Sequence, residues 1–412
     1  MKPKVLLITT TTAYPLYSGG ALAQYYFIDG LKDKVDMSFC TVVKTDNDYN
    51  NLQLLMKAQP SLKVFFSDER HKRKKNFLNI VKCKTLGLLN AFKHSDKSIF
   101  TEPDDFSDTY FSHIDHAYSK AFVDLVNDVI VKEKIDIVQF DFYDTIDMVF
   151  ALPDNVKKVF IHHEVRSKRL RLAKDKSLIS NAFKNFLIAK TDVFEKACLP
   201  FMDVVGVFNE DDANELRAFC KKIVVTPFAI PDEQIYDLPE SKTFDRLFFV
   251  GGEGHTPNAL GLKWFLDDVY IPNYDKIKLP LLIIGNWSES FKTKYINCPG
   301  VVFCGVVDSM KPYFEHSIFV NPILTGAGLR TKVLHAFANS VPVLSTRFGA
   351  EGCFDSEEDK HIGLFDNADE FLKVLSEKNY KDMAHLVNVY YSKKFNKNQL
   401  LHIRQQLYDL TK

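Results

Sequence analysis

Apolar runs of strand length alternate along this chain with segments of helical spacing, and this alternation restricts the possible folds most. The first series of runs covers 5–10, 37–43, 62–66, 135–140, 156–161, 204–208 and 223–226. Helical patterns lie between several of these runs, notably over 114–134 and 181–199. Apolar strands separated by helices are typical of a parallel sheet that is covered on both faces. The pattern therefore predicts a doubly wound α/β domain.

The alternation stops at a polar stretch, 232–245, and a second series follows it over 246–250, 281–284, 301–306, 318–322, 341–345 and 362–365. We expect an N-terminal Rossmann-like domain over 1–232 and a C-terminal one over 240–395, facing each other across a cleft that binds ligands. The helical pattern over 396–412 could pack back onto the first domain. A length of 412 residues suits two domains.

Charge and hydropathy exclude several classes of protein. Lys+Arg and Asp+Glu both number 53, so no overall charge attracts the chain to nucleic acid, and no nucleic-acid partner is expected. No window reaches the roughly 18 apolar residues of a membrane span, and the apolar part of the N-terminus is too short for a signal peptide. The seven cysteines are dispersed without metal-ligand spacing, which favours free thiols. These features predict a cytoplasmic protein.

The most informative short segment is PILTGAGLRTK, residues 322–332. An apolar strand runs into a glycine-rich turn, and a helix that carries two cations follows. Unpaired backbone N–H groups at a helix start, together with nearby cations, form a site for anions. The segment thus predicts a site for a phosphate-bearing small molecule; the alternative is an ordinary turn whose glycines only permit tight packing. The site would comprise Gly326, Ala327, Gly328, Leu329, Arg330 and Lys332.

The second half of the chain resembles the C-terminal domain of retaining glycosyltransferases with the GT-B fold, specifically family 4, the group 1 glycosyltransferases. The matching blocks are 248–265, 281–286, 300–307 and 322–352, and their order and spacing are more specific than any one block. Weaker matches lie at 14–31 and 159–170. The resemblance implies two facing Rossmann-like domains and a nucleoside-diphosphate sugar as donor substrate, with no separate cofactor.

The resemblance also implies roles in the first domain. Gly19 and Gly20 lie in a loop that faces the donor diphosphate and the acceptor in this family, and glycine permits close backbone approach. A histidine at the end of the strand over 156–161 hydrogen-bonds the transferred sugar in similar enzymes. We favour His163, because Glu164 follows it as an acidic residue does in the family, whereas His162 alternates to the other face. A plain turn and a structural histidine are the alternatives.

We expect Arg330 and Lys332 to bind the diphosphate and, with His163, to form the catalytic set. Negative charge grows on the leaving phosphate as the glycosidic bond breaks, so cations placed there stabilise the transition state. Positions 330 and 332 of a regular helix point about 200° apart. Both side chains can therefore reach one ligand only if Arg330 precedes the helix; otherwise Lys332 is favoured. A solvated helix face is the alternative.

The chain departs from the family in two segments. Many members have two glutamates separated by seven residues, and here Ala327 and His335 occupy these places. A neutral histidine can still hydrogen-bond a ribose hydroxyl, which is the role we expect for His335. Backbone N–H groups at Ala327 would take over the sugar contact. Gly252 belongs to a block in which many relatives carry an Arg and a Lys as phosphate ligands, and both are missing here.

Two further residues receive roles from the resemblance. Val306 lies where relatives bind the nucleotide base through backbone groups, and Glu351 would contact a sugar hydroxyl or cap a turn. No carboxylate pair is placed to hold a metal beside the phosphates, so no metal is expected.

A basic segment over 70–97 holds eight lysines and arginines before its first acidic residue, Asp96, and apolar residues accompany them. A basic amphipathic segment can lie on an anionic membrane, which would suit a lipid-linked acceptor and peripheral attachment at the inner face of the membrane. A helix that packs on the core with a solvated basic face is the alternative.

The expected activity is transfer of a sugar, with retention of configuration, from a nucleoside-diphosphate sugar to a glycan or lipid-linked acceptor. Such an enzyme would serve cell-surface polysaccharide or glycoconjugate synthesis. Two alternatives remain. A sugar-nucleotide epimerase of the same fold should show paired carboxylates in the cleft, and the missing glutamates would also suit a non-catalytic sugar-nucleotide-binding protein.

Overall fold

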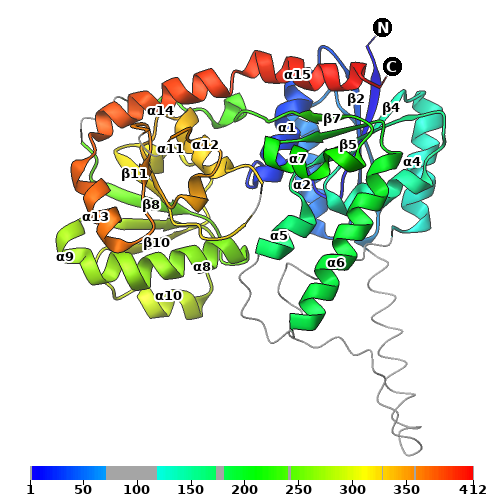
Figure 1. The fold of residues 1–412 in the computed structure, drawn as a ribbon. Helices are drawn as coiled ribbons and strands as arrows, with labels where there is room; N and C mark the ends of the chain where they lie inside the picture. The colour runs from blue at the N-terminus through cyan, green and yellow to red at the C-terminus, as the bar shows by residue number, and fades with distance from the viewer. Residues whose placement is uncertain are drawn as a thin grey trace, which may run out of the picture.

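The computed structural model describes residues 2–70, 118–172, 181–239, 243–326, 328–356 and 359–411. Within them, two parallel sheets are covered by helices (Figure 1), which confirms the predicted fold class. The strand orders are β3-β2-β1-β4-β5-β6-β7 and β10-β9-β8-β11-β12-β13. Each order reverses next to its first strand, and ligands of such sheets bind at the carboxyl ends of the strands near that reversal.

The first sheet consists of β1 Lys4–Ile8, β2 Asp36–Val43, β3 Lys63–Asp68, β4 Ile137–Asp141, β5 Lys157–His162, β6 Val204–Val207 and β7 Ile223–Val225. Its α-helices are α1 Gly19–Leu31, α2 Asp46–Ala58, α4 Lys120–Glu133, α5 Arg166–Leu172, α6 Asn181–Cys198 and α7 Glu210–Leu216. A 3-10 helix, η2 (Tyr143–Ala151), follows β4, and three shorter ones lie at η3 Leu199–Phe201, η4 Arg217–Phe219 and η5 Asp232–Gln234.

The second sheet consists of β8 Arg246–Val250, β9 Leu281–Ile284, β10 Val301–Gly305, β11 Ser317–Asn321, β12 Val343–Ser345 and β13 Gly363–Leu364. Its α-helices are α8 Thr256–Trp264, α9 Tyr274–Ile277, α10 Glu289–Tyr295, α11 Lys311–Phe314, α12 Thr331–Ala338 and α13 Ala368–Glu377. A π-helix over Phe265–Tyr270 extends α8, and 3-10 turns lie at Ile271–Asn273 and Phe348–Ala350. The chain ends with α14 Tyr380–Lys394 and α15 Lys397–Asp409.

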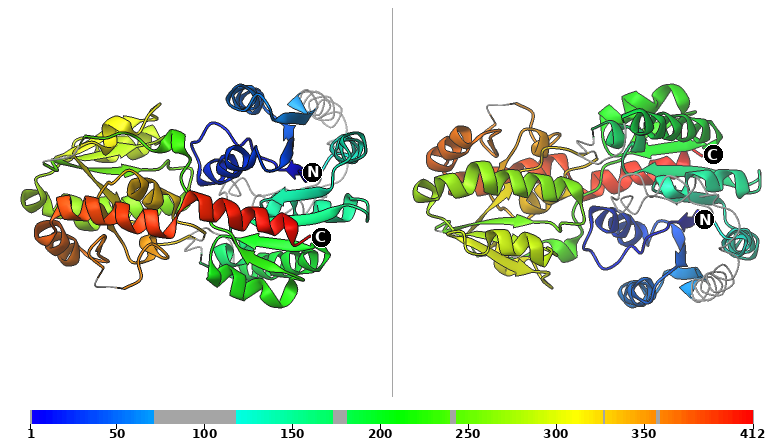
Figure 2. Two further views of the ribbon diagram at one scale, coloured as in Figure 1. Left: turned by 90° about the horizontal axis from the view of Figure 1, so that it is seen from above. Right: turned by 90° about the horizontal axis from the view of Figure 1, so that it is seen from below.

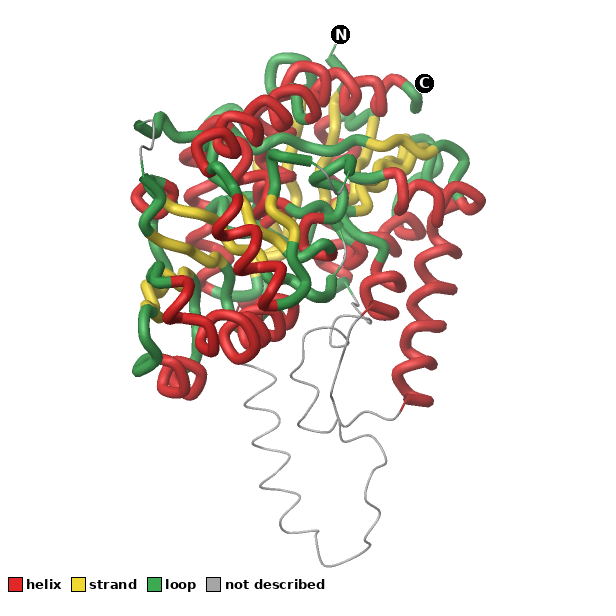
Figure 3. The backbone as a smooth tube through the Cα atoms, turned by 60° about the vertical axis from the view of Figure 1, so that its left-hand side comes forward, coloured by secondary structure: helices red, strands yellow, loops and turns green. Residues whose placement is uncertain are grey.

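The strands are apolar on both faces because helices cover both faces of each sheet. Val5 and Leu7 of β1 pack into the same core as residues of α1, whereas Leu6 and Ile8 pack into the core that includes residues of α4. Strands of both sheets lie inside a shell of helices in Figure 3. This double burial explains why the sequence shows continuous apolar runs instead of alternating ones.

The last two helices run from the second domain back to the first (red in Figures 1 and 2), and α15 packs on α1. A Cβ atom on Gly30 would lie 2.5 Å from Leu401, so the absence of a side chain permits this approach. The Tyr408 hydroxyl donates a hydrogen bond to Gln139 of β4 at 2.6 Å. The end of the chain is therefore part of the first domain's core.

Among the described residues, no helix is long and apolar enough to cross a bilayer. The basic segment 70–97 lies outside the described residues except for Arg70, which forms ion pairs with Asp46 at 3.1 Å and Asp68 at 2.6 Å. Membrane binding by this segment stays a prediction.

Candidate functional site

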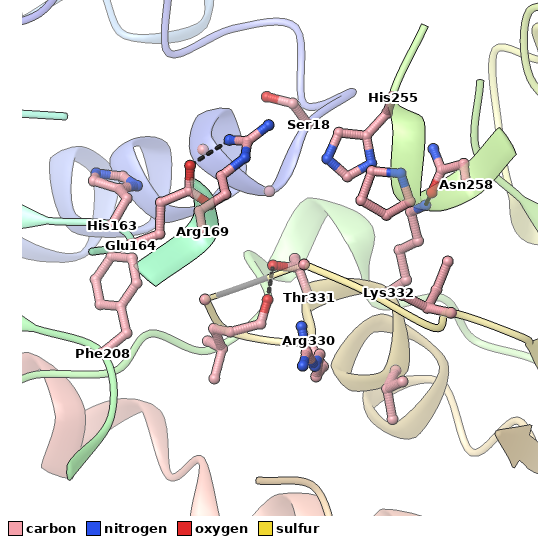
Figure 4. Close-up of a pocket in the computed structure, with 18 of the residues that line it drawn as sticks. Ser18, His163, Glu164, Arg169, Phe208, His255, Asn258, Arg330, Thr331 and Lys332 are labelled. Carbon is pink, nitrogen blue, oxygen red and sulfur yellow. Dashed lines mark hydrogen bonds and ion pairs between the residues drawn. The ribbon is translucent and has the colours of Figure 1, made fainter. Parts of the chain in front are cut away.

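A cavity of about 460 Å³ lies between the two domains. Its walls come from the start of α1, from the loops after β1, β4, β5 and β6, and, across the cleft, from the segments after β8 and β11. Figure 4 shows these two sets of side chains facing each other. The predicted residues that line the cavity are Gly19, Gly20, His163, Gly326, Gly328, Leu329, Arg330 and Lys332.

Lys332 is the most unusual side chain of the cavity. Its Nζ donates a hydrogen bond of 2.6 Å to the side-chain oxygen of Asn258 (Figure 4). Burial lowers the pKa of Lys332 to about 8, and no carboxylate among the described residues offsets this shift. A buried ammonium group without an anionic partner is unfavourable by itself, and a bound anion would compensate it.

Arg330 precedes α12 as its N-cap residue, so the condition under which both cations reach one ligand is met. Its guanidinium lies 4.7 Å from the centroid of the Phe348 ring and forms an ion pair of 2.9 Å with Glu351. Burial lowers the pKa of Arg330, while Glu351 opposes this shift. The Nε atom is buried without a hydrogen-bond partner among the described residues. Arg330 can therefore offer a further N–H group to a ligand.

The two histidines after β5 have different environments. His162 is buried and hydrogen-bonds Glu195 of α6 at 2.7 Å. His163 lines the cavity and approaches Asp141 at 3.2 Å through Nε2. Strand alternation therefore places His163 and not His162 at the cleft, as expected for a contact with the transferred sugar. That contact stays a prediction.

The glycines of the α1 loop allow close contacts on both sides of the cleft. A Cβ atom on Gly19 would lie 2.8 Å from the Thr331 hydroxyl of the second domain, and one on Gly20 would lie 2.7 Å from the Phe142 ring. Gly326 and Gly328 adopt φ angles of 134° and 82°, which favour glycine. Ala327, between them, lies outside the described residues.

His335 does not line the cavity, where the predicted ribose contact would place it. Its Nε2 hydrogen-bonds the backbone carbonyl of Gln234 in the interdomain segment at 3.0 Å. Burial lowers the pKa of His335 to about 4, so the ring is neutral at pH 7 and Nε2 is the donor. The sequence gives the position of His335 on its helix but not the linker that packs against it.

We expect His335→Ala to leave the affinity for UDP within about twofold of the wild type and to lower thermal stability. The substitution leaves the Gln234 carbonyl without one of its donors, a loss that typically costs about 1–3 kcal/mol. Calorimetric titration with UDP and thermal unfolding measure the two effects separately. A tenfold loss of UDP affinity at unchanged stability would instead support a contact between His335 and the ribose.

Three other predicted contacts lie outside the cavity lining. Val306 is 70% exposed and follows β10, whose last residue, Gly305, turns with a φ of 72°. Gly252 packs near Asn286: a Cβ atom on Gly252 would lie 3.3 Å from the backbone oxygen of Asn286. Glu351 reaches the site only through its ion pair with Arg330. Direct donor contacts by these residues stay predictions.

Sequence reasoning missed several residues that line the cavity. Asn258 holds Lys332 and also donates to the Gly252 carbonyl at 3.0 Å. His255 is the N-cap of α8, and burial followed by the Lys332 charge lowers its pKa to about 4, so it is neutral. Arg169 forms an ion pair with Glu164 across from them (Figure 4). The contact between Asn258 and Lys332 joins segments 74 positions apart, and no local pattern in the sequence signals it.

The cavity is electropositive on the side of the second domain. Among the described lining residues, Glu164 is the one carboxylate, and the cations are Arg166, Arg169, Arg330 and Lys332. Glu164 pairs with Arg166 at 3.8 Å and with Arg169, and Arg330 pairs with Glu351, so the lining cation without a carboxylate partner among the described residues is Lys332. The described residues include no cluster of His, Cys, Asp or Glu that could hold a metal ion.

Two facing, doubly wound domains with a ligand cavity between them define the class of GT-B proteins, and similar solved structures share this fold. One is the sucrose-phosphate synthase from Thermosynechococcus elongatus, with a TM-score of 0.68 and 12% identity over 99% of this chain and 98% of that chain. A TarM variant of S. aureus in complex with fondaparinux, alpha-GlcNAc-glycerol and UDP has a TM-score of 0.65 and 11% identity over 99% and 100%.

The pneumococcal O-GlcNAc transferase GtfA, in complex with UDP and GlcNAc, has a TM-score of 0.59 and 10% identity, with 99% of each chain covered. Residues 245–377 match the family described as glycosyl transferases group 1. Residues 245–377 are thus similar to the group 1 glycosyltransferases, and the whole chain has the GT-B fold. No curated protein matches the chain in sequence.

Proposed function

We propose that this protein transfers a sugar from a nucleoside-diphosphate sugar to a glycan or lipid-linked acceptor with retention of configuration. The observation that carries the proposal is the ammonium group of Lys332, which is held by Asn258 at the cavity between the domains and has no carboxylate partner among the described residues. A diphosphate would supply the missing negative charge. Arg330 and the backbone N–H groups at the start of α12 lie beside it and would add donors.

In this mechanism the second domain stabilises the leaving diphosphate. Charge grows on its terminal phosphate as the glycosidic bond breaks, and the buried cations stabilise that charge more strongly than water would. The sugar would extend across the cavity toward His163 and the Gly19 loop of the first domain. An acceptor hydroxyl would then attack from the face that the diphosphate leaves, which retains the configuration.

The similar structures support a UDP-sugar as the first donor to try, because those of the TarM variant and GtfA contain UDP. The resemblance of the sequence to group 1 glycosyltransferases supports a polysaccharide or glycoconjugate acceptor. The basic segment 70–97 would bring the protein to an anionic membrane that presents a lipid-linked acceptor.

Calorimetric titration with UDP, GDP and ADP tests the nucleotide site, and a panel of UDP-sugars with and without lipid and glycan acceptors tests transfer. We expect saturable binding of at least one diphosphate, turnover of its sugar, and NMR signals of a product with the donor's anomeric configuration. Failure of all three diphosphates to bind would reject the proposal, and a product of inverted configuration would reject retention.

The non-catalytic alternative predicts tight binding of a nucleotide sugar without turnover in the same assays. The epimerase alternative requires paired carboxylates, and the described lining of the cavity offers Glu164 alone.

A further inference from the structure

A chain of buried polar side chains leads from the C-terminal helix to the cavity. The Tyr408 hydroxyl donates to Gln139 Oε1 at 2.6 Å, and Gln139 Nε2 donates to Asp141 Oδ1 at 2.7 Å. The other carboxylate oxygen of Asp141 accepts from Gln24 at 3.2 Å and faces His163 Nε2 at 3.2 Å. Tyr408, Gln139, Gln24 and Asp141 are all at least 97% buried. This hydrogen-bond network thus connects α15, β4 and α1 to the side chain of His163 at the cleft.

The ring of His163 is also held by aromatic contacts. Phe142 stacks on it with ring centroids 3.8 Å apart and an angle of 27°, and Phe208 meets it edge-on at 4.9 Å. Phe142 adopts φ 72° and ψ 153°, a backbone conformation that is unfavourable for any residue except glycine. Such strain is found where the surrounding structure requires a residue to adopt one orientation. Here it places the Phe142 ring flat against the imidazole.

The hydrogen bonds determine which nitrogen of His163 carries the proton. An ionised carboxylate only accepts hydrogen bonds, and Asp141 already accepts from both glutamine amides. The Nε2 atom of His163 must therefore be the donor in its contact with Asp141. In a neutral ring, Nδ1 then keeps its lone pair and acts as an acceptor.

We propose that Asp141 and Phe142 are positioning residues that hold His163 as the Nε2–H tautomer, so that Nδ1 accepts a hydrogen bond from a hydroxyl of the bound sugar. Gln139 and Tyr408 of α15 hold Asp141 in turn, so the end of the chain is part of the support of the site. The sugar contact rests on the proposed function, whereas the tautomer and its supports do not.

Nitrogen-15 NMR of histidine-labelled protein tests the tautomer directly, with His163→Gln identifying the signals of His163. In the ligand-free wild type we expect a protonated Nε2 and an unprotonated Nδ1. In Asp141→Asn the amide can donate as well as accept, so we expect the single tautomer to be replaced by a mixture or by Nδ1–H. A wild-type Nδ1–H tautomer, or unchanged His163 signals in Asp141→Asn, would overturn the proposal.

Tyr408→Phe tests the link to α15, with Tyr26→Phe as the matched control. Both tyrosines are buried, and Tyr26 donates its hydrogen bond to the Lys397 carbonyl of the same helix at 3.1 Å instead of to Gln139. We expect Tyr408→Phe to shift the His163 signals and Tyr26→Phe to leave them unchanged. Equal shifts in both variants, or none in either, would remove α15 from the support of His163.

Titration with UDP separates this inference from the proposed function. We expect Asp141→Asn to bind UDP within about twofold of the wild type, because the diphosphate site belongs to the second domain. A wild type that binds no nucleoside diphosphate would contradict the proposed function and leave the tautomer result standing. A wild type that binds UDP but shows Nδ1–H would contradict only the inference about Asp141.

Discussion

Lys332→Met is expected to lower the affinity for UDP at least tenfold and to leave the folded protein as stable as the wild type or more so. The affinity falls because the variant loses a charge-assisted hydrogen bond to the diphosphate, worth about 1.5–3 kcal/mol or roughly 10–150-fold. Stability does not fall because the ammonium group is desolvated without a carboxylate partner in the described part of the chain, and methionine fills similar space without a charge. Calorimetry and thermal unfolding measure the two effects.

The same lysine gives a pH dependence. Its pKa in the folded protein is about 8, so the fraction of charged Lys332 falls roughly tenfold between pH 7 and pH 9. UDP affinity should decline over this window in the wild type but not in Lys332→Met. The folded-state pKa also lies below the unfolded value of about 10.4, so the unfolded chain binds more protons between them. Any stability advantage of the variant should therefore shrink as the pH rises above 8.

Lys373→Met is the matched control, because it makes the same substitution at an exposed lysine of α13 in the same domain. It should leave both UDP affinity and its pH dependence unchanged. If Lys332→Met bound UDP as the wild type does, Lys332 would have no part in the diphosphate site.

Glu195→Ala is expected to cause the largest loss of stability, about 3–5 kcal/mol of unfolding free energy, because it removes one partner of a buried pair. Glu195 is fully buried and accepts hydrogen bonds from His162, the Arg166 amide and the Ser167 hydroxyl at 2.7, 2.8 and 2.9 Å. Without it, these donors stay buried and unsatisfied. Urea unfolding followed by circular dichroism measures the loss.

Acid should reduce the contribution of Glu195 to the free energy of unfolding. Burial raises the pKa of Glu195, but His162 and the donors of Arg166 and Ser167 outweigh burial and hold it below its usual value. The stabilisation is therefore present above the unfolded pKa of about 4.5 and is lost as the pH falls through the folded value. The difference between wild type and Glu195→Ala should shrink in acid.

Glu133→Ala is the control in the same domain, because Glu133 pairs with Lys63 at the surface at 2.6 Å. Exposed pairs contribute little, so we expect a much smaller change than for Glu195→Ala. Equal losses in the two variants would show that the buried network around His162 has no special role.

The sequence predicted the elements and the glycine-rich part of the site because both signals are local. The run over 246–250 is β8, 281–284 is β9, and the patterns over 181–199 and 396–411 correspond to α6 and α15 within about two residues. The segment over 322–332 likewise predicted a turn, a helix start and two cations at the cavity. In each case the signal lies within one strand or one turn of helix.

Partners that are distant in sequence could not be predicted. Asn258 contacts Lys332 across 74 positions, and Asp141 contacts His163 from another strand of the sheet. His335 has the residue type and helix position for a ligand contact, yet the linker at Gln234 takes its hydrogen bond. Which group a side chain meets depends on how the domains and α15 pack, and this packing leaves no local pattern.

By itself, the amino-acid order determined two series of parallel strands and a glycine-rich turn before a helix with two cations at its start, because apolar period and turn chemistry act between near neighbours. The tertiary structure decided that Lys332 meets Asn258 and, within the described ranges, no carboxylate, that His163 and not His162 faces the cleft, and that α15 reaches back to Gln139 of β4. These outcomes depend on burial and on contacts between distant segments, which exist only once the two domains have packed together.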